Sequence, residues 1–319
     1  MKRGIKEFGD AGVNDVHKEM KHLHDRSVPI PVEPHKLYSG SKTATLKYLM
    51  FLQMKQDGRV KGRGFTDVRS QQAYTDKDEN SSPKVATESL MILCVIDSME
   101  RRAVATLDIQ GAFLQADMDE LVYVKFEELM TKLLSKIYPK LYEKYVVIEL
   151  VQTVLYAALA HLLHGTLQAS LLLCRKLTGI LVDSGYKINP YDWCMDSKEF
   201  NGCHCTVLWH IDDLKWSHLI DDVMTVEIEF MNKLFGSKDA PLTVCRVKIH
   251  DYLVMALDYS LHEKEKITMF EYIEGFLSKI PSPLKGDSVT AAPNHLFEVR
   301  DDAPMLQPTD AKIYYHYVV

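Results

Sequence analysis

The segment from Leu150 to Cys174 contains no Asp, Glu, Lys or Arg, and it constrains the fold more than any other feature of the sequence. About 20 apolar residues can span a bilayer as a helix, so a membrane helix is one interpretation. Four polar or small residues interrupt it at the i, i+3, i+4 and i+7 spacing of a helix face: His161, His164, Gly165 and Gln168. Polar groups are costly inside a bilayer. The pattern therefore favours a helix over 151–175 that is buried in a globular core, with one edge facing a site.

The composition indicates a globular protein that can bury a sizeable core. The chain has 319 residues, of which 46% are hydrophobic and 26% charged, which is enough for more than one domain or subdomain. The formal net charge of -6 excludes a surface that is basic overall. Because binding to nucleic acid depends largely on phosphate neutralisation, any such site must be a local basic patch.

Six cysteines are spread along the chain, and no apolar signal-peptide core lies near the start. These features predict reduced thiols in an intracellular protein. Cys203 and Cys205 flank His204, which suggests a metal site, but zinc sites usually require a second pair of ligands and none follows. The alternative is a strand whose residues alternate between two faces.

Hydrophobic periodicity predicts a mixture of helices and strands. Helices are expected over 14–25, with Asn14 as the cap, and over 41–55, 86–99 and 223–234. Strands are expected over 103–107, 121–125, 203–209, 214–217 and 251–259, while 267–280 is either a helix or a strand followed by a helix. The order does not alternate regularly between strand and helix, so the fold class is α+β.

A local basic segment covers residues 55–69, with five cations against two aspartates. Gly58, Gly62 and Gly64 lie between the cations and would let the backbone approach a ligand closely. A phosphate-binding hairpin and a solvated basic loop both explain this composition.

Three aspartates lie where predicted strands end. Asp108 closes the strand 103–107, and Asp212 with Asp213 lies at the tip of a predicted hairpin. Two-metal phosphoryl transfer needs carboxylates from separate segments, and magnesium prefers such oxygen ligands. Aspartate is also a favoured turn residue for local hydrogen-bonding reasons, so turn formation alone is the alternative.

The segments DIQGAFL (108–114) and WHIDDLK (209–215) resemble the paired palm motifs of copia-type reverse transcriptases, in the same order and separation. The resemblance runs from about residue 8 to the end of the chain. It continues through GDAGVNDVHKEMKHLHD, KGRGFTDVRSQQAY, SSPKVATESL, GTLQASLL, GYKINPYDWC and HDYLVMALDYS, and AAPNHLFEV is similar to the segment that joins the polymerase to ribonuclease H.

The resemblance implies catalytic roles. Asp108 and Asp212 would coordinate two Mg²⁺ ions, which Mn²⁺ could replace, and Asp213 would be the supporting third carboxylate. The implied reaction is attack of a primer 3'-hydroxyl on the α-phosphate of a deoxynucleoside triphosphate.

It also implies nucleotide-binding roles. Lys61 and Arg63, together with Arg69, would hold the triphosphate, and Phe113 would lie under the sugar and exclude a 2'-hydroxyl. Gly165 and Gln168 would line the pocket beside the template base.

The implied architecture is a right-hand polymerase over 1–285: fingers over about 1–88 and 115–150, a palm with a small antiparallel sheet over about 89–114 and 151–240, and a thumb-like part over 241–285. Residues 286–319 would begin the connection to ribonuclease H. The implied partners are a primed RNA or DNA template and deoxynucleoside triphosphates, with no membrane. Self-association and contacts with other polyprotein products stay open, and the implied location is a cytoplasmic particle or the nucleus.

Several positions depart from the family pattern. His164 stands where the family has Tyr, and Leu173-Cys174 where it has Phe-Trp. Valine replaces glycine at three positions, which predicts strain wherever the backbone needs positive φ: Val68, Val247 and Val254. The chain resembles a fragment of a longer reading frame. Three hypotheses follow: an RNA-directed DNA polymerase, an inactive remnant that at most binds nucleic acid, and an unrelated α+β scaffold.

Overall fold

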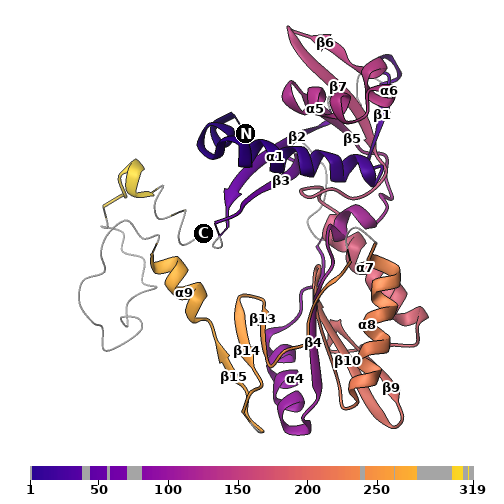
Figure 1. Ribbon diagram of the computed structural model, residues 1–319, viewed down its shortest axis with the longest axis vertical. Coiled ribbons are helices and arrows are strands. Elements are labelled where there is room, and N and C mark those ends of the chain that lie inside the picture. The colour runs from indigo at the N-terminus through magenta and orange to yellow at the C-terminus, as the bar shows by residue number, and fades with distance from the viewer. Residues whose placement is uncertain are drawn as a thin grey trace.

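The computed structural model describes residues 2–37, 44–55, 58–69, 81–237, 241–261, 263–278, 304–311 and 315. The fold is mixed α+β, as the sequence predicts, with two six-stranded sheets and a three-stranded one. Figure 1 shows two lobes, with the first sheet in the upper lobe and the second in the lower.

The first sheet has the strand order β1-β7-β5-β2-β3, and β6 pairs with β7. Its strands are β1 (Pro29–Val32), β2 (Leu46–Met54), β3 (Val60–Asp67), β5 (Tyr123–Glu127), β6 (Val147–Glu149) and β7 (Gln152–Leu159). Three helical segments accompany it: α1 (Lys2–Asp25), α5 (Leu129–Ile137) and α6 (Pro139–Tyr142). Apolar residues of α1 and α5 pack on the inner face of the sheet and form one core, which includes Met20, Leu134 and Phe126.

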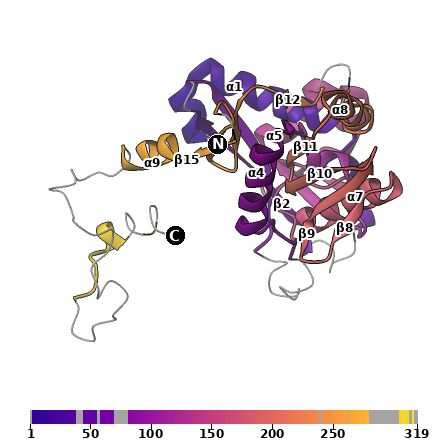
Figure 2. The ribbon, with the colours of Figure 1, turned by 90° about the horizontal axis from the view of Figure 1, so that it is seen from below.

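The second sheet has the strand order β12-β4-β11-β10-β9-β8. These strands are β4 (Ala103–Asp108), β8 (Lys187–Asn189), β9 (Asp192–Phe200), β10 (Cys203–His210), β11 (Asp213–His218) and β12 (Thr243–Cys245). Helices α7 (Ala169–Asp183) and α8 (Asp221–Phe235) lie on one face and α4 (Thr87–Glu100) on the other (Figure 2). The core under α7 and α8 contains the fully buried Trp209 and Trp216.

The third sheet is formed by β13 (Ile249–Tyr252), β14 (Met255–Asp258) and β15 (Lys266–Thr268). Tyr252 and Leu257 of this sheet pack against α4 and against Leu208 of β10. Helix α9 (Phe270–Leu277) follows β15, so residues 267–280 contain a strand and then a helix as far as 278, where the described part of this region ends. Short 3-10 helices cover Pro34–Lys36 (η1), Ala112–Gln115 (η2) and Glu143–Tyr145 (η3).

The predicted buried helix over 151–175 is wrong. Residues 152–159 form β7, a connection follows, and α7 begins only at Ala169. His161, His164, Gly165 and Gln168 therefore do not form a helix face, because they lie in the connection between β7 and α7. A strand buried on both faces has a continuous apolar run, which periodicity alone does not distinguish from a buried helix.

Two further element predictions are wrong. The segment 46–54 is strand β2 rather than part of a helix over 41–55, and its inward residues follow a period of two: Leu46, Tyr48 and Met50. The segment 251–259 is a hairpin of β13 and β14 rather than one strand. Residues 41–43 of the first prediction lie outside the described residues.

Other predictions of helices and strands are confirmed. Helices α4 and α8 and strands β4, β10 and β11 occupy the expected segments. Helix α1 covers the expected first helix but begins at Lys2, so the prediction of Asn14 as its cap is wrong. All six cysteines carry free thiols, and Cys203 and Cys205 lie on a strand. Within the described ranges, no helix is long and apolar enough to cross a membrane.

Candidate active site

The β10–β11 hairpin brings the three aspartates together at one end of the second sheet. Strand β4 pairs with β11 so that Asp108 lies directly opposite Asp213. Directly opposed residues of an antiparallel pair project from the same face of the sheet. The backbone N–H of Ile109 donates to the carbonyl of Asp212 at 3.3 Å, which ties the end of β4 to the hairpin turn.

The hairpin turn is tight and strained. His210 pairs with Asp213, so only Ile211 and Asp212 form the loop. Ile211 has a φ of 61°, a conformation that costs a β-branched residue on the order of 1 to 3 kcal/mol. The surrounding contacts must hold this turn, and Asp212 with it.

Burial raises the pKa of all three carboxyl groups, and repulsion between carboxylates adds to the rise for Asp108 and Asp213. Burial and then the charges of Asp212 and Asp108 raise the pKa of Asp213 to about 6. Burial and the charge of Asp212 raise the pKa of Asp108, and burial raises that of Asp212. Concentrated negative charge of this kind is relieved when a divalent cation binds.

The fit to metal ions is partial. Asp108 and Asp212 would offer carboxylate oxygens from two separate segments, which is the ligand chemistry that Mg²⁺ requires. Among the residues that the structure describes, however, no three His, Cys, Asp or Glu side chains converge closely enough to hold an ion. A bound ion would therefore need further oxygen ligands from substrate phosphates or water.

Strand β3 presents the predicted phosphate-binding cations to these aspartates. Lys61 and Arg63 are exposed on β3. The charge of Lys61 partly offsets the rise in the pKa of Asp108 and of Asp212, and the charge of Arg63 does the same for Asp212. Lys55, which precedes this strand, also acts on Asp108. The basic segment and the acidic cluster are thus electrostatic neighbours although they belong to different sheets.

The glycines of β3 serve packing within the upper lobe. A Cβ at Gly64 would lie 1.8 Å from the hydroxyl oxygen of Tyr48. The backbone N–H of Gly64 donates to a carboxylate oxygen of Glu19 on α1 at 3.3 Å, and that of Gly62 donates to Asp15. These glycines therefore allow Tyr48 and α1 to approach β3, rather than leaving the backbone open to a ligand.

The connection between β7 and α7 docks on β3. Gly165 has a φ of 89°, and a Cβ there would lie 2.5 Å from the carbonyl oxygen of Thr66. The backbone N–H of Thr66 donates to the carbonyl of His164 at 2.8 Å. Gln168, half-buried, immediately precedes α7.

Phe113 is buried in η2 and packs edge-on against the imidazole of His164, with ring centroids 4.5 Å apart. Partial desolvation, followed by the charges of Arg63 and Lys61, lowers the pKa of His164. Phe113 and His164 therefore lie on the same side of the molecule as the basic strand.

Arg69 lies apart from this group. Its guanidinium donates to both carboxylate oxygens of Asp67, at 2.8 Å from Nε, and its side chain is 85% exposed. This pairing lowers the pKa of Asp67 to about 2.

Three contributors have no signal in the sequence analysis. The Tyr252 hydroxyl, which is buried, donates to the carbonyl of Asp213 at 3.2 Å. The guanidinium carbon of Arg26 lies 3.7 Å from the position of a Cβ on Gly111, close to the chain that follows Asp108. Lys55 belongs to the basic segment, but the sequence does not indicate that its charge acts on Asp108. All three depend on contacts across long sequence separations, which periodicity does not report.

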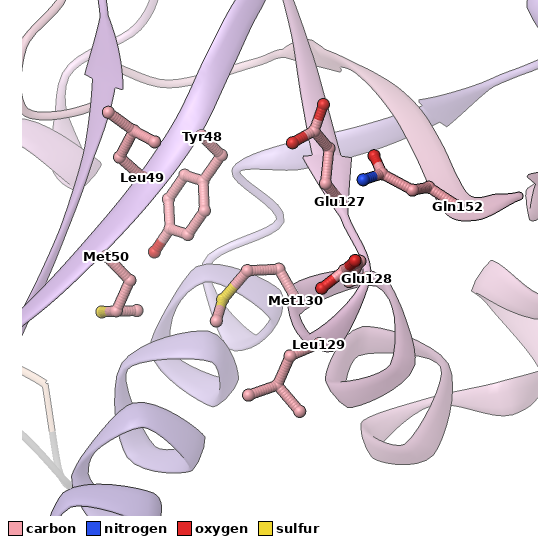
Figure 3. Close-up of a pocket in the computed structure, with 8 residues that line it drawn as sticks. All are labelled: Tyr48, Leu49, Met50, Glu127, Glu128, Leu129, Met130 and Gln152. Carbon is pink, nitrogen blue, oxygen red and sulfur yellow. The ribbon is translucent and has the colours of Figure 1, made fainter. Parts of the chain in front are cut away.

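A separate pocket of about 280 Å³ lies in the upper lobe (Figure 3). Its lining includes Tyr48, Glu127, Glu128 and Gln152, and none of the predicted site residues belongs to it. The candidate site is therefore the open region around the aspartates, not this pocket.

Comparison with known families supports the same region. Residues 36–130 match the family described as reverse transcriptase (RNA-dependent DNA polymerase). The chain thus resembles an RNA-directed DNA polymerase. Asp108, Phe113 and the basic strand of this polymerase-like chain lie within the matched residues, whereas Asp212 and Asp213 lie beyond them. No curated protein is significantly similar in sequence.

Among solved structures, the chain is similar to a foamy viral protease-reverse transcriptase in complex with dsDNA. The identity is 13% and the TM-score 0.45, over 86% of this chain and 45% of the viral chain. The polymerase-like chain therefore spans less than half the length of that protein.

Proposed function

We propose that the chain is an RNA-directed DNA polymerase of the copia type, which transfers a nucleotide from a deoxynucleoside triphosphate to a primer 3'-hydroxyl. One observation carries the proposal. The β4–β11 ladder sets Asp108 opposite Asp213, with Asp212 on the adjoining turn. Lys61 of another sheet acts on Asp108 and Asp212, and Arg63 acts on Asp212. Acidic groups beside exposed cations suit a reaction in which metal ions and a triphosphate meet.

The roles follow from charge and position. Asp108 and Asp212 would hold two Mg²⁺ or Mn²⁺ ions, with Asp213 in support. When bound, such ions stabilise the attacking and leaving oxygens of an in-line displacement. Lys61 and Arg63 would neutralise the triphosphate, as Arg69 would after leaving Asp67.

Phe113, Gly165 and Gln168 would shape the nucleotide pocket. Phe113 is 7% exposed and lies against His164, so its ring has a fixed position from which it could exclude a 2'-hydroxyl. Gly165 holds its connection against β3, and Gln168 lies three residues beyond it. The template base would lie beside this connection.

The right-hand layout belongs to the same proposal. The first sheet with α1 corresponds to fingers, the second sheet with α4, α7 and α8 to a palm, and the third sheet with α9 to a thumb-like part. Strand β7 pairs within the first sheet, although the palm boundary suggested by the resemblance begins at 151. Residues 286–319 would begin the connection to ribonuclease H.

The decisive experiment is extension of a primed RNA template by the purified chain. Extension should require Mg²⁺ or Mn²⁺, and Asp212→Asn should reduce it at least about 100-fold, because an anionic ligand and its electrostatic stabilisation are lost. The exposed Asp183→Asn, far from the ladder on the end of α7, is the matched control and should keep full activity. Equal activity of both variants would contradict the proposal.

A second candidate function is binding of nucleic acid without catalysis. It is favoured by the absence of three converging metal-ligating side chains among the described residues. In that case, purified protein would bind primed template with strong salt dependence and extend nothing with either metal.

A further inference from the structure

A row of four lysines lies on the upper lobe, outside the candidate active site. They recur every fourth residue along α5, α6 and η3, and all four are exposed: Lys132, Lys136, Lys140 and Lys144. They are called the lysine ridge below. In Figure 1, α1 and β3 lie between α5 and the lower lobe, so the ridge is not part of the region around the aspartates.

Few acidic groups accompany the ridge, although the charge of Lys144 acts on Glu33. Residues 129–145 contain a single acidic residue, Glu143, within a chain whose net charge is -6. No described carboxylate lies within 4.0 Å of a ridge ammonium group. By contrast, α8 carries four acidic residues and one lysine. Like charges at i and i+4 destabilise a helix, which applies to Lys132 and Lys136 within α5, whereas Lys140 and Lys144 follow a break in the helix at Tyr138.

Packing holds the ridge in a defined position. Leu134 and Tyr142 on the opposite side of the segment are fully buried. His24 of α1 lies 3.1 Å from the Tyr142 hydroxyl through its Nδ1 atom and stacks on the Tyr138 ring at 5.0 Å. The lysines therefore point outward from an anchored surface rather than from a loose loop.

An aromatic ring lies within the row. Tyr138 falls between Lys136 and Lys140 in sequence and is 46% exposed, with His24 stacked on one face of its ring and the other face left for a base. Cations along a backbone track, with an aromatic surface between them, are the combination that binds single-stranded nucleic acid, because bases stack on the ring while cations neutralise phosphates. An anionic lipid surface would use the lysines but has no need of the ring.

We propose that the lysine ridge binds single-stranded nucleic acid outside the active site, with Tyr138 as a stacking surface for one base. This site goes beyond the proposed polymerase activity and does not require it. It would hold an unpaired strand on the outside of the upper lobe.

The test is binding of a labelled oligouridine to the full chain over a range of salt concentrations. Replacement of all four ridge lysines by glutamine should weaken binding at least about tenfold at low salt and reduce the slope of log K against log salt by about 3, since four phosphates contribute about 0.7 each. Tyr138→Ala should weaken binding about fivefold or more without changing the slope.

The matched control removes the same charge elsewhere. Glutamine at four other exposed lysines should leave the affinity and the slope nearly unchanged: Lys187, Lys233, Lys248 and Lys264. The ridge variant should melt no lower than the parent, because it loses like-charge repulsion. Equal losses in the ridge and control variants, an unchanged slope in the ridge variant, or ridge-dependent binding to phosphatidylserine vesicles but not to RNA would each overturn the proposal.

The outcome is separable from the polymerase proposal. Asp212→Asn should bind oligouridine as the parent does, even where extension is lost. The ridge variant should extend a primer on a template with a single unpaired nucleotide as the parent does, if the parent is active.

Discussion

Asp196 is an acidic residue whose side chain is buried without a hydrogen-bond partner among the described residues. It lies on β9 with 0% exposure, beneath α7. Burial and then the neighbouring Cys174 raise its pKa to about 7. The buried group is costly once it ionises, since nothing nearby compensates its charge.

This predicts a pH-dependent stability. Because the folded pKa is raised above its unfolded value of 3.8, the contribution to stability is full below about pH 4 and is lost as the pH rises through 7. Asp196→Asn should therefore be more stable than the parent by about 4 kcal/mol at pH 8, and the difference should disappear at pH 4. Urea unfolding across this range measures it, with the exposed Asp183→Asn as a control that should show no such trend.

Val254 has a strained backbone conformation, and the sequence predicts this strain. Of the three valines that replace a family glycine, Val254 has a φ of 62°, whereas Val68 and Val247 are not among the described residues with positive φ. Leu253 beside it has a φ of 48°. Two positive values in a two-residue loop correspond to the hairpin turn that normally carries Asn-Gly.

Val254→Gly should accordingly stabilise the fold by about 1 kcal/mol, because glycine adopts this conformation without steric cost. Thermal unfolding would show a higher midpoint for this variant. Val247→Gly is the comparison, and it should gain nothing or lose stability. A gain of equal size at both positions would mean that the left-handed turn is not the cause.

At the scale of elements, the β13–β14 hairpin supports the turn that carries the catalytic candidates. The Tyr252 hydroxyl donates to the carbonyl of Asp213 and lies 3.5 Å from that of Leu208. Tyr259, which directly follows β14, donates instead to the Cys94 sulfur of α4 at 3.4 Å. The two tyrosines therefore form a natural pair for comparison.

Tyr252→Phe should slow primer extension about three- to tenfold while leaving the affinity for primed template unchanged, since a hydrogen bond worth about 1 kcal/mol is lost behind Asp213. Tyr259→Phe should leave the extension rate near that of the parent. Single-turnover kinetics separate the rate from the affinity. If both variants lose the same activity, Tyr252 has only a general structural role.

At the scale of the whole molecule, one of the connections between the two lobes packs on β3. The chain leaves the first sheet at β7, passes over β3 at Gly165 and enters the lower lobe at α7. The contacts of Thr66 with His164 and Gly165 hold the basic strand near this passage. The position of Lys61 and Arg63 near the aspartates therefore depends on this crossing.

Gly165→Ala should thus destabilise the protein by about 2 to 4 kcal/mol, because the added methyl would meet the Thr66 carbonyl in an already left-handed backbone. Gly179→Ala in α7 is the control; its Cβ would meet nothing within 4 Å, and alanine favours the helix. Chemical denaturation should rank the two variants on opposite sides of the parent. A neutral Gly165→Ala would show that the crossing is not tightly packed.

The sequence by itself determined the α+β class, the hairpin carrying Asp212 and Asp213, and the strand that ends at Asp108. These features depend on local signals: alternating apolar residues, turn residues and strand ends. It misassigned 46–54 and 152–159 as helix. For 152–159 the reason is that β7 is buried on both faces and has no polar face to reveal its period.

Only the tertiary structure decided which residues meet. The pairing of β4 with β11 places Asp108 opposite Asp213, and the docking of β3 brings Lys61 and Arg63 to them from another sheet. The support from Tyr252 and the burial of Asp196 arise in the same way. Each depends on contacts between segments far apart in the chain, and strand pairing and packing determine these contacts rather than the residues adjacent in sequence.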